Sequence, residues 1–342
     1  MMPTGNHCPG PRRGQRGAAI LMAMLTVVLV ATLASAMLWQ QWRQVEVESA
    51  QRTRVQSQWI LTGALDWARL ILREDARQGG SDNLTEPWAV PLAPARLSTF
   101  LAAQQGQATV GDDDDPSQEA FLSGNIQDLQ SRLNLTNLVD GDKVHAPTRA
   151  VWARLFKQLN LPEAELDTLT QRLLLAVAAG GNVVNSAAAE SPGAPPTPLM
   201  PTSVSELGWL GLSSPTLSAI APYITVLPVR TVVNLNTAPL EVLVASVPNL
   251  TPAQARQLIQ SRATQPLNTL MDALLVVTDA KVKFDPAEQG VASRFFSVTG
   301  QLRVGSNTVE EQSVLQRDGR VVKTLSRKRG VVTLPLAGST LQ

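Results

Sequence analysis

Few residues of this chain belong to the types that catalyse reactions or hold metals tightly. The single cysteine is Cys8, and the two histidines, His7 and His145, are far apart in the sequence. A disulfide framework, a zinc cluster and a histidine-based catalytic triad each need more of these residues. No convergent polar site is visible in the sequence either, so we predict that the protein is not an enzyme.

An acidic run, GDDDDP, extends from Gly111 to Pro116. Calcium prefers carboxylate oxygens, but a calcium-binding loop places its ligands at alternating positions. Four adjacent aspartates lack that spacing and are more typical of a solvated loop. We therefore favour an exposed loop over a calcium site at this run.

The segment VNLNTAPLEVLVASVPNLTPAQARQLIQSR, from Val233 to Arg262, has the pattern of two short helices joined by a turn. Thr237 is expected to cap the first helix, and Thr251 the second, with Pro252 at its first position. Such a helix-hairpin-helix binds DNA when glycine amides in its turn meet a phosphate. The residues that define the motif are Asn234, Asn236, Thr237, Pro239, Pro248 and Thr251.

This hairpin lacks the features of a DNA-binding one. Its turn reads VPNL and contains no glycine, and Pro248 has no amide hydrogen to offer. Nearby basic residues are balanced by acidic ones, and the whole chain carries a net charge of only +1. We expect the hairpin to have a packing role. The alternative is a membrane-anchored, competence-type DNA-binding protein. In that case residues 230–285 would bind DNA with an affinity that falls as the salt concentration rises.

The element that precedes all of these is an apolar run from Ala18 to Leu38, with Arg12, Arg13 and Arg16 before it. About 20 apolar residues in helical form span a hydrocarbon core of roughly 30 Å. Because the basic residues concentrate before the run, the positive-inside rule predicts a cytoplasmic N-terminus and an external globular part.

Two other interpretations of the run stay open. Ala34-Ser35-Ala36 has the small-x-small pattern of a signal-peptidase site, which would give a periplasmic binding protein beginning at Met37. The run could also be a plain single-pass anchor. Against cleavage within it, no proline or glycine interrupts the expected helix between Ala18 and Thr62.

Helical spacing continues beyond the membrane segment to about Ala76, which would make a rod of roughly 90 Å at 1.5 Å per residue. Two rows of residues recur at helical spacing and predict an amphipathic, packed helix. The rows are Trp59, Gly63, Trp67 and Ile71, and Ile60, Ala64, Ala68 and Leu72.

The remaining pattern predicts an α+β fold in which strands flank a helical block. A half-exposed strand is expected within residues 121–144, with a turn at Asp140-Gly141 and turn or cap roles for Asn134 and Asn137. Helical periodicity follows at 151–159, after Pro162, at 169–177 and at 205–220, and residues 223–233 are extended. Strands are predicted at 295–304, 309–317 and 320–325, with hairpin turns at 305–307 and 318–319.

A basic leader ending in Arg16-Gly17, an uninterrupted apolar helix from Ala18 and an amphipathic continuation resemble type IV pilins and the pseudopilins of type II secretion. The resemblance implies cleavage between Gly17 and Ala18 by a prepilin peptidase and methylation of the new amine of Ala18. The fifth mature residue is then Met22, where most members carry a glutamate. Buried carboxylates in lipid are costly without a partner, and a tip subunit has no neighbour above it to provide one.

The absence of that glutamate is typical of one minor pseudopilin family, protein K. The string I-x-D-x-Q-S-R-x-N-x-x-N-L, residues 126–138, and the string NLNTAP, residues 234–239, also resemble this family. The resemblance implies a pilin-like long helix packed on an antiparallel sheet, with an inserted α-domain of two units similar to sterile-alpha-motif or helix-hairpin-helix domains. It covers the chain from Arg16 to about Arg329.

From this resemblance we expect eight segments. They are a leader (1–17), a transmembrane helix (18–38), its periplasmic continuation (39–76), the first pilin strands (77–138), inserted helical units at 139–228 and 229–290, with a proline-rich loop at 185–201, C-terminal strands (291–329) and a tail (330–342).

The function implied is that of a minor pseudopilin at the tip of the periplasmic pseudopilus that drives protein export. Its partners would be the I-type and J-type minor pseudopilins, the major pseudopilin, the inner-membrane assembly platform and the prepilin peptidase. It would cross the bacterial inner membrane once, with a periplasmic globular part and no role for nucleic acid. The resemblance requires no cofactor and leaves calcium open, without assigned ligands.

Overall fold

The computed structural model describes residues 16–97, 120–181, 198–305 and 307–332. The chain divides into two compact units, residues 1–59 and 60–342, each described here by itself. Four expectations lie outside the described residues: the leader arginines Arg12 and Arg13, the acidic run 111–116, most of the proline-rich loop 185–201, and most of the tail 330–342.

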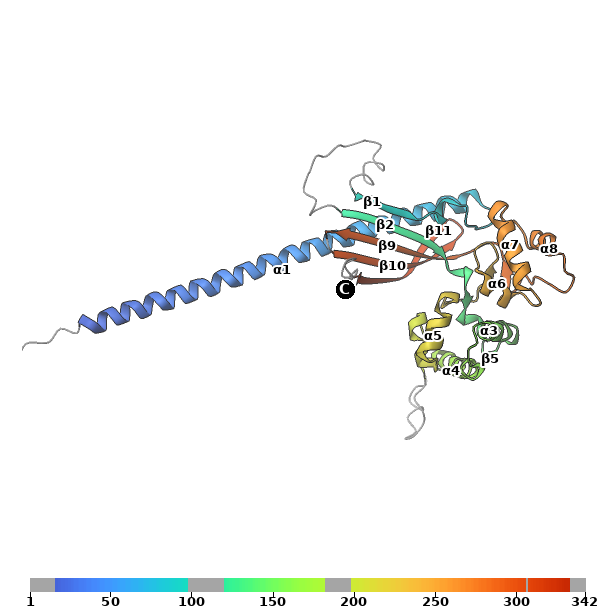
Figure 1. Cartoon of the computed structure of the whole chain (residues 1–342), viewed down its shortest axis with the longest axis horizontal. Coiled ribbons are helices and arrows are strands. Elements are labelled where there is room, and N and C mark those ends of the chain that lie inside the picture. The colour runs from blue at the N-terminus through green and yellow to red at the C-terminus, as the bar shows by residue number, and fades with distance from the viewer. Residues whose placement is uncertain (1–15, 98–119, 182–197, 306, 333–342) are drawn as a thin grey trace, which may run out of the picture. The chain divides into compact units, whose positions relative to one another are not determined.

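A single helix, α1 (Arg16–Gln78), begins the described chain (Figure 1). In the first unit its side chains are exposed from Ala19 to Gln56. The threonine hydroxyls of its apolar part are satisfied locally, because Thr26 and Thr32 each donate to the carbonyl three residues earlier, at 2.9 Å. Both threonine hydroxyls on the apolar surface are therefore satisfied within the helix itself.

In the second unit α1 buries one row of side chains: Leu61, Leu65, Ala68 and Leu72. The predicted helix is confirmed, and so is the packing of the second predicted row, Ile60, Ala64, Ala68 and Leu72. The first row is wrong at Trp59, which is 73% exposed, and at Gly63, which is exposed too, whereas Ile71 packs against the core. The buried row follows the i, i+4, i+7, i+11 spacing of the helix face that covers the sheet.

The sheet in this unit has five strands in the order β1-β2-β9-β10-β11, and every neighbouring pair is antiparallel. The strands are β1 (Leu92–Arg96), β2 (Ala120–Asp128), β9 (Phe295–Val304), β10 (Asn307–Asp318) and β11 (Val321–Val332). Gly124 of β2 lies opposite Gly300 of β9, and a Cβ on Gly300 would be 3.3 Å from the Leu61 side chain. Glycine at this position allows α1 to pack closely on the sheet.

A short 3-10 helix, η1 (Pro87–Ala89), fills the core between α1 and the sheet. Its Trp88 is 1% exposed and meets the ring of Phe296 edge-on, with centroids 5.3 Å apart. These two aromatic rings join Leu65, Leu72 and Leu315 in one hydrophobic cluster.

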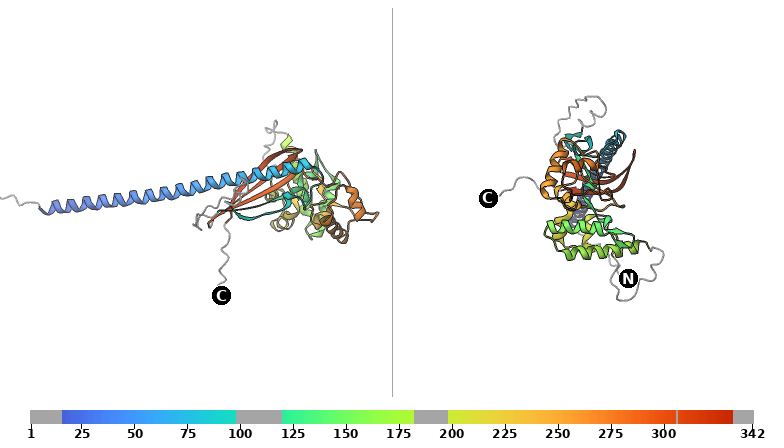
Figure 2. Two further views of the ribbon diagram at one scale, coloured as in Figure 1. Left: turned by 90° about the horizontal axis from the view of Figure 1, so that it is seen from above. Right: turned by 90° about the vertical axis from the view of Figure 1, so that its right-hand side faces the viewer.

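All the other elements are inserted between β2 and β9. Two groups of helices are visible in Figures 1 and 2. The first group contains α3 (Ala146–Gln158), α4 (Glu163–Gly181), η6 (Val204–Leu210), α5 (Ser214–Ile220) and η7 (Ala221–Tyr223); the second contains α6 (Leu240–Ser246), α7 (Pro252–Thr264) and α8 (Leu270–Val276). Trp152 of α3 and Leu243 of α6 belong to one continuous core, so the two groups fold together.

Short paired segments connect these helices to the sheet. They are η3 (Leu129–Ser131), β3 (Leu133–Asn134), η4 (Leu135–Leu138), β4 (Val139–Asp140), β5 (Lys143–Val144), β6 (Ile224–Thr225), β7 (Val233–Asn234) and β8 (Gln289–Gly290). β3 pairs in parallel with β6, and β7 pairs in parallel with β8. The turn predicted at Asp140-Gly141 is confirmed between β4 and β5, with Gly141 at φ 62°.

The mixed α+β class, with a long N-terminal helix, an antiparallel sheet and an additional helical block, is confirmed. Three local predictions are wrong. The strand predicted within 121–144 ends at Asp128, whose side chain accepts a hydrogen bond from Gln130 N and starts a 3-10 turn. The patterns after Pro162 and at 169–177 form one helix, α4. The last strand continues to Val332, well beyond the predicted end at Leu325.

Candidate functional site: the apolar helix, the hairpin and a polar junction

The predicted processing residues lie at the start of α1, where Arg16, Gly17 and Ala18 belong to its first turn. Met22 follows on the helix and is 68% exposed. Between Ile20 and Leu38 the large apolar side chains are each more than half exposed. Such a surface requires hydrocarbon or other helices to cover it. Among the described residues, this is the one helix long and apolar enough to cross a membrane.

The helix-hairpin-helix predicted at 233–262 is present as α6 and α7. Thr251 caps α7 in a capping box with Gln254, and Pro252 is at the first position, as predicted. Pro248 precedes Asn249, which takes a left-handed conformation with φ 63° in the turn. Its side chain donates to the carbonyl of Lys281 at 3.1 Å, so the turn is fixed by a neighbouring loop.

Thr237 does not cap α6, which corrects the prediction. The N-cap residue is Pro239, without a side-chain cap, and the Thr237 hydroxyl donates to the Asp128 carboxylate at 2.6 Å. A hydrogen bond from a hydroxyl to an ionised carboxylate is charge-assisted and therefore strong, and it holds Thr237 away from the start of α6. Asn236 bonds to the backbone N and O of Leu267, at 2.9 Å each, and therefore joins the hairpin to the segment before α8.

Arg262, at the end of α7, faces the protein interior. It is 8% exposed and donates to the carbonyls of Leu235 and Ala238, the latter at 2.7 Å. Burial without a carboxylate partner lowers the pKa of Arg262 to about 10. This cation supports the NLNTAP turn and is not available to a phosphate.

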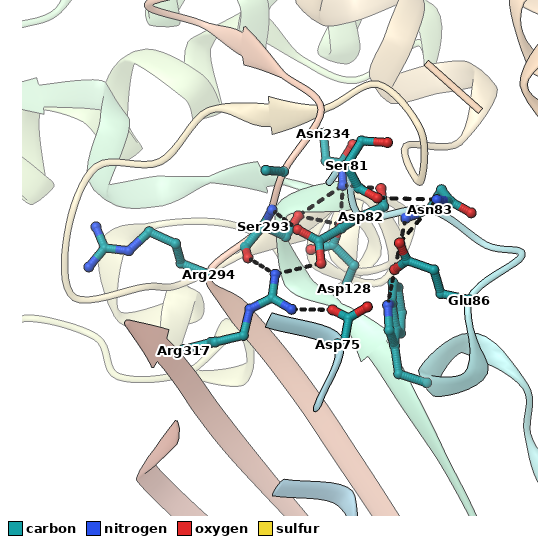
Figure 3. A network of polar contacts seen from close by, with 12 residues as sticks. Asp75, Ser81, Asp82, Asn83, Glu86, Asp128, Asn234, Ser293, Arg294 and Arg317 are labelled. Atoms are coloured by element: carbon teal, nitrogen blue, oxygen red, sulfur yellow. Dashed lines mark hydrogen bonds and ion pairs between the residues drawn. The ribbon is translucent and has the colours of Figure 1, made fainter. Parts of the chain in front are cut away.

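A polar junction connects the sheet, the end of α1 and the hairpin (Figure 3). At its centre Asp128, the last residue of β2, is 4% exposed. Its carboxylate accepts hydrogen bonds from Gln130 N, Asn234 Nδ2, Thr237 Oγ1 and Ser293 Oγ, at 2.6 to 3.0 Å. Burial raises the pKa of Asp128, and these hydrogen bonds oppose that rise.

Arg317 of β10 forms the second centre of the junction. Its guanidinium pairs with Asp75 of α1 and with Asp82 of the following loop, and it donates to the carbonyl of Ser293 at 2.8 Å. It also lies over the ring of Phe296, 4.8 Å from the centroid. Burial raises the pKa of Asp82, and Arg317 opposes the rise.

Asp82 connects the two centres. Its carboxylate accepts from Ser293 N at 2.6 Å, and its backbone carbonyl accepts from Asn234 Nδ2 at 3.0 Å. Asn234 therefore contacts Asp82, Asp128 and Ser293 together. Both strings singled out in the sequence, 126–138 and 234–239, meet in this junction.

Two asparagines of the string 126–138 bond to the loop that precedes β7. Asn137 exchanges two hydrogen bonds with the backbone of Thr231, at 2.6 and 3.0 Å. Asn134 caps η4 and also donates to Val229 O at 2.8 Å. The turn and cap roles predicted for both asparagines are confirmed for Asn134, while Asn137 mainly bridges two segments.

A calcium ion does not fit the carboxylates of this junction. Asp75, Asp82 and Glu86 have oxygens within 4.8 Å of one another. Calcium needs six to eight oxygen ligands, but Asp75 and Asp82 already hold the guanidinium of Arg317, and Glu86 accepts from Trp88 and Asn83. The positive charge here is supplied by the protein itself.

Five residues of the junction were not predicted as site residues from the sequence: Asp75, Asp82, Asp128, Ser293 and Arg317. Their one visible signal is that Asp128 belongs to the string 126–138, which resembles the protein K family. The partners lie up to 242 positions apart in the chain, as with Arg317 and Asp75. A local sequence pattern cannot predict a contact between residues so far apart in the chain.

Comparisons with known proteins agree with this architecture. Two family models of type II secretion system protein K match, one at residues 131–229 and the other at 233–291. The type II secretion system protein K of Pseudomonas aeruginosa is 28% identical, covering 95% of this chain and 96% of that protein. That of Klebsiella pneumoniae is also 28% identical, with 93% and 97% covered.

A solved structure shares the fold. It is the GspK-GspI-GspJ complex from the type 2 secretion system of enterotoxigenic Escherichia coli, with a TM-score of 0.61 at 17% identity over 82% of this chain and 98% of the solved one. The matched models span both helical groups, and the curated relatives align over nearly their whole length. The chain therefore belongs to the protein K family of type II secretion systems, a family of minor pseudopilins in protein transport.

Proposed function

We propose that this protein is the tip subunit of a type II pseudopilus and that it works by assembly rather than by catalysis. The observation that carries the proposal is the combination of an exposed apolar helix, without an acid at Met22, and a helical insertion at one end of the sheet. The helix supports anchoring in the bacterial inner membrane, with the leader in the cytoplasm and the globular part in the periplasm.

The position of the insertion in the fold supports a capping role. It leaves the sheet at Asp128 and returns at Phe295, and Asp128 pairs with Phe296 at the same end of the sheet. Asp75, near the C-terminal end of α1, contacts Arg317 at this end, whereas Leu61 packs near Gly300, farther toward the other end. The insertion thus lies at the end of the sheet reached by the end of α1, where the next subunit of a shaft would stack.

In this proposal the I-type and J-type minor pseudopilins are the direct partners. The solved relative is itself a complex of three such subunits. Prepilin peptidase would cut between Gly17 and Ala18, and the major pseudopilin and the assembly platform would extend the filament below. Growth of the filament would then move secreted proteins through the outer membrane.

The test is to locate the protein in assembled filaments. The full-length chain, tagged at the exposed Leu175 of α4, is co-expressed with the pseudopilins and the platform of its own system. Antibody labelling in electron microscopy should mark one end of each pseudopilus. Labelling along the shaft, or filaments that form equally well without the protein, would overturn the proposal.

DNA binding finds no support in the hairpin. Pro248 stands in the turn, and Arg262 is buried against backbone carbonyls. Lys281, a cation near the hairpin, also has an acidic neighbour: a hydrogen bond from the Lys281 backbone N and the charge of Lys281 both lower the pKa of Asp279.

A further inference from the structure

One cation of segment 126–138 takes no part in the polar junction. Gln130, Asn134 and Asn137 all bond across to residues 229–294. Within the described structure, the side chain of Arg132 has a single hydrogen bond, to Gln127 Oε1 of its own segment at 3.3 Å. Burial lowers the pKa of Arg132, and the nearby Asp128 carboxylate opposes that shift; this carboxylate already accepts hydrogen bonds from four other donors.

Arg132 lines a groove of about 330 Å³ beside the sheet. The walls combine apolar side chains, among them Leu84, Trp88, Ile126 and Pro239, with polar residues of β2 and of the turn after it. Leu84, at 57% exposure, is open to solvent on the rim. A groove with apolar and polar walls and one cation suits a ligand that combines a carboxylate with both apolar and hydrogen-bonding neighbours.

The same groove contains an unpaired strand edge. β1 pairs with β2 only as far as Gly124, whereas β9 pairs with the other edge of β2 as far as Asp128. In the described chain, residues Asn125–Asp128 therefore have no strand partner on the β1 side, and all four line the groove. This edge is about 13 Å long at roughly 3.3 Å per residue. Gln127 is exposed on this stretch, and an unpaired strand edge accepts an extended segment as an added strand.

We propose that this groove docks an extended segment from the head of a neighbouring minor pseudopilin, which adds to β2 at Asn125–Asp128 and places an aspartate or glutamate on Arg132. Charge complementarity selects an acidic segment, because the Arg132 guanidinium lies in the groove and, among the described residues, no carboxylate forms an ion pair with it. The inference rests on the proposed function, since the partner is another subunit of the tip.

The test measures the dissociation constants of the full-length, processed protein in detergent with the purified I-type and J-type subunits of its own system. Arg132→Gln should weaken binding to one of them by about tenfold, and Arg132→Lys should restore part of that loss. Leu84→Asp, which adds a negative charge at the rim and removes no buried group, should also weaken binding. The matched controls are Arg256→Gln on α7 and Leu175→Asp on α4, both exposed and outside the groove.

Hydrogen exchange gives a second readout, because an added strand should protect amides within residues 125–128 in the complex. Unchanged affinity for both Arg132→Gln and Leu84→Asp would overturn the inference, and the proposed function would stand. If the unmodified protein bound neither subunit, the proposed function would fail and this inference with it. Self-association that depends on Arg132 would refute the choice of partner.

Discussion

At the scale of single residues, Arg317 shows how one side chain fixes several segments. It neutralises Asp75 and Asp82, whose side chains are 15% and 4% exposed. Removing one partner of a buried ion pair typically costs 3–5 kcal/mol, because a charge remains buried without compensation. We predict a loss of that order, roughly 3–5 kcal/mol, in the unfolding free energy of Arg317→Leu, measured by urea denaturation.

The control for this prediction is Arg294→Leu, which removes an exposed pair with Asp318. Exposed pairs contribute little to stability, so its urea midpoint should stay close to that of the unmodified protein. Equal losses for the two variants would show that Arg317 has no special role in the junction.

Glu86 provides a pH-dependent test of the same region. Burial raises the pKa of Glu86 from 4.5 to about 7, against the effect of the hydrogen bond from Trp88. A raised pKa means that the folded protein binds the proton of Glu86 more tightly than the unfolded chain does. Proton binding therefore adds to the unfolding free energy in full below pH 4.5, and this contribution is lost as the pH rises through 7.

Between pH 5 and 8 the unfolding free energy should therefore fall by roughly 1–2 kcal/mol more in the unmodified protein than in Glu86→Gln, after allowance for partial exposure. Denaturation curves at several pH values measure this difference. Parallel pH profiles for the two proteins would contradict the raised pKa of Glu86.

At the scale of elements, the pairing of β2 with β9 depends on glycine. A Cβ on Gly124 would lie 2.6 Å from the backbone oxygen of Thr299, so the two strands would have to move apart. We predict that Gly124→Ala lowers the unfolding free energy by about 1–3 kcal/mol. Gly330→Ala in β11 is the control, since nothing lies within 4 Å of its added Cβ; an equal loss there would rule out this steric explanation.

Local patterns predicted most of these elements because their causes are local. Thr251 and Pro252 indicate the start of α7. The C-terminal hairpins are indicated by the alternation of apolar and polar residues and by the turn residues between the strands. Thr237 misled the prediction because its hydroxyl bonds to Asp128, 109 positions earlier. All of the junction depends on contacts between residues that are far apart in the chain. The sequence therefore pointed to the strings 126–138 and 234–239 but not to the hydrogen-bond network that they form.

At the scale of the whole molecule, the junction couples the end of α1 to the helical insertion. Arg317 of β10 contacts Asp75 at the end of α1 and Asp82 in the loop that follows. Asn234 of the insertion bonds to Asp82 and to Asp128 of β2. Both regions are fixed to the same end of one sheet. In the proposed assembly, a load applied to the insertion would therefore reach α1 through a buried polar network and not through a free linker.

Retention of the apolar helix after maturation decides whether that assembly can be anchored. We predict that the mature protein, purified from membranes of a strain containing its prepilin peptidase, begins at a methylated Ala18. Intact-mass measurement and N-terminal sequencing both report this start directly.

Gly17→Val, at the predicted cleavage position, should leave the leader attached, whereas the control Met22→Leu, inside the apolar helix, should be processed like the unmodified protein. The resemblance to pilins requires the small residue at Gly17 and makes no demand on the length of the side chain at Met22. A mature start at Met37 would instead identify a signal peptide. That result would remove the exposed apolar surface by which the protein is proposed to stay in the membrane and join a filament.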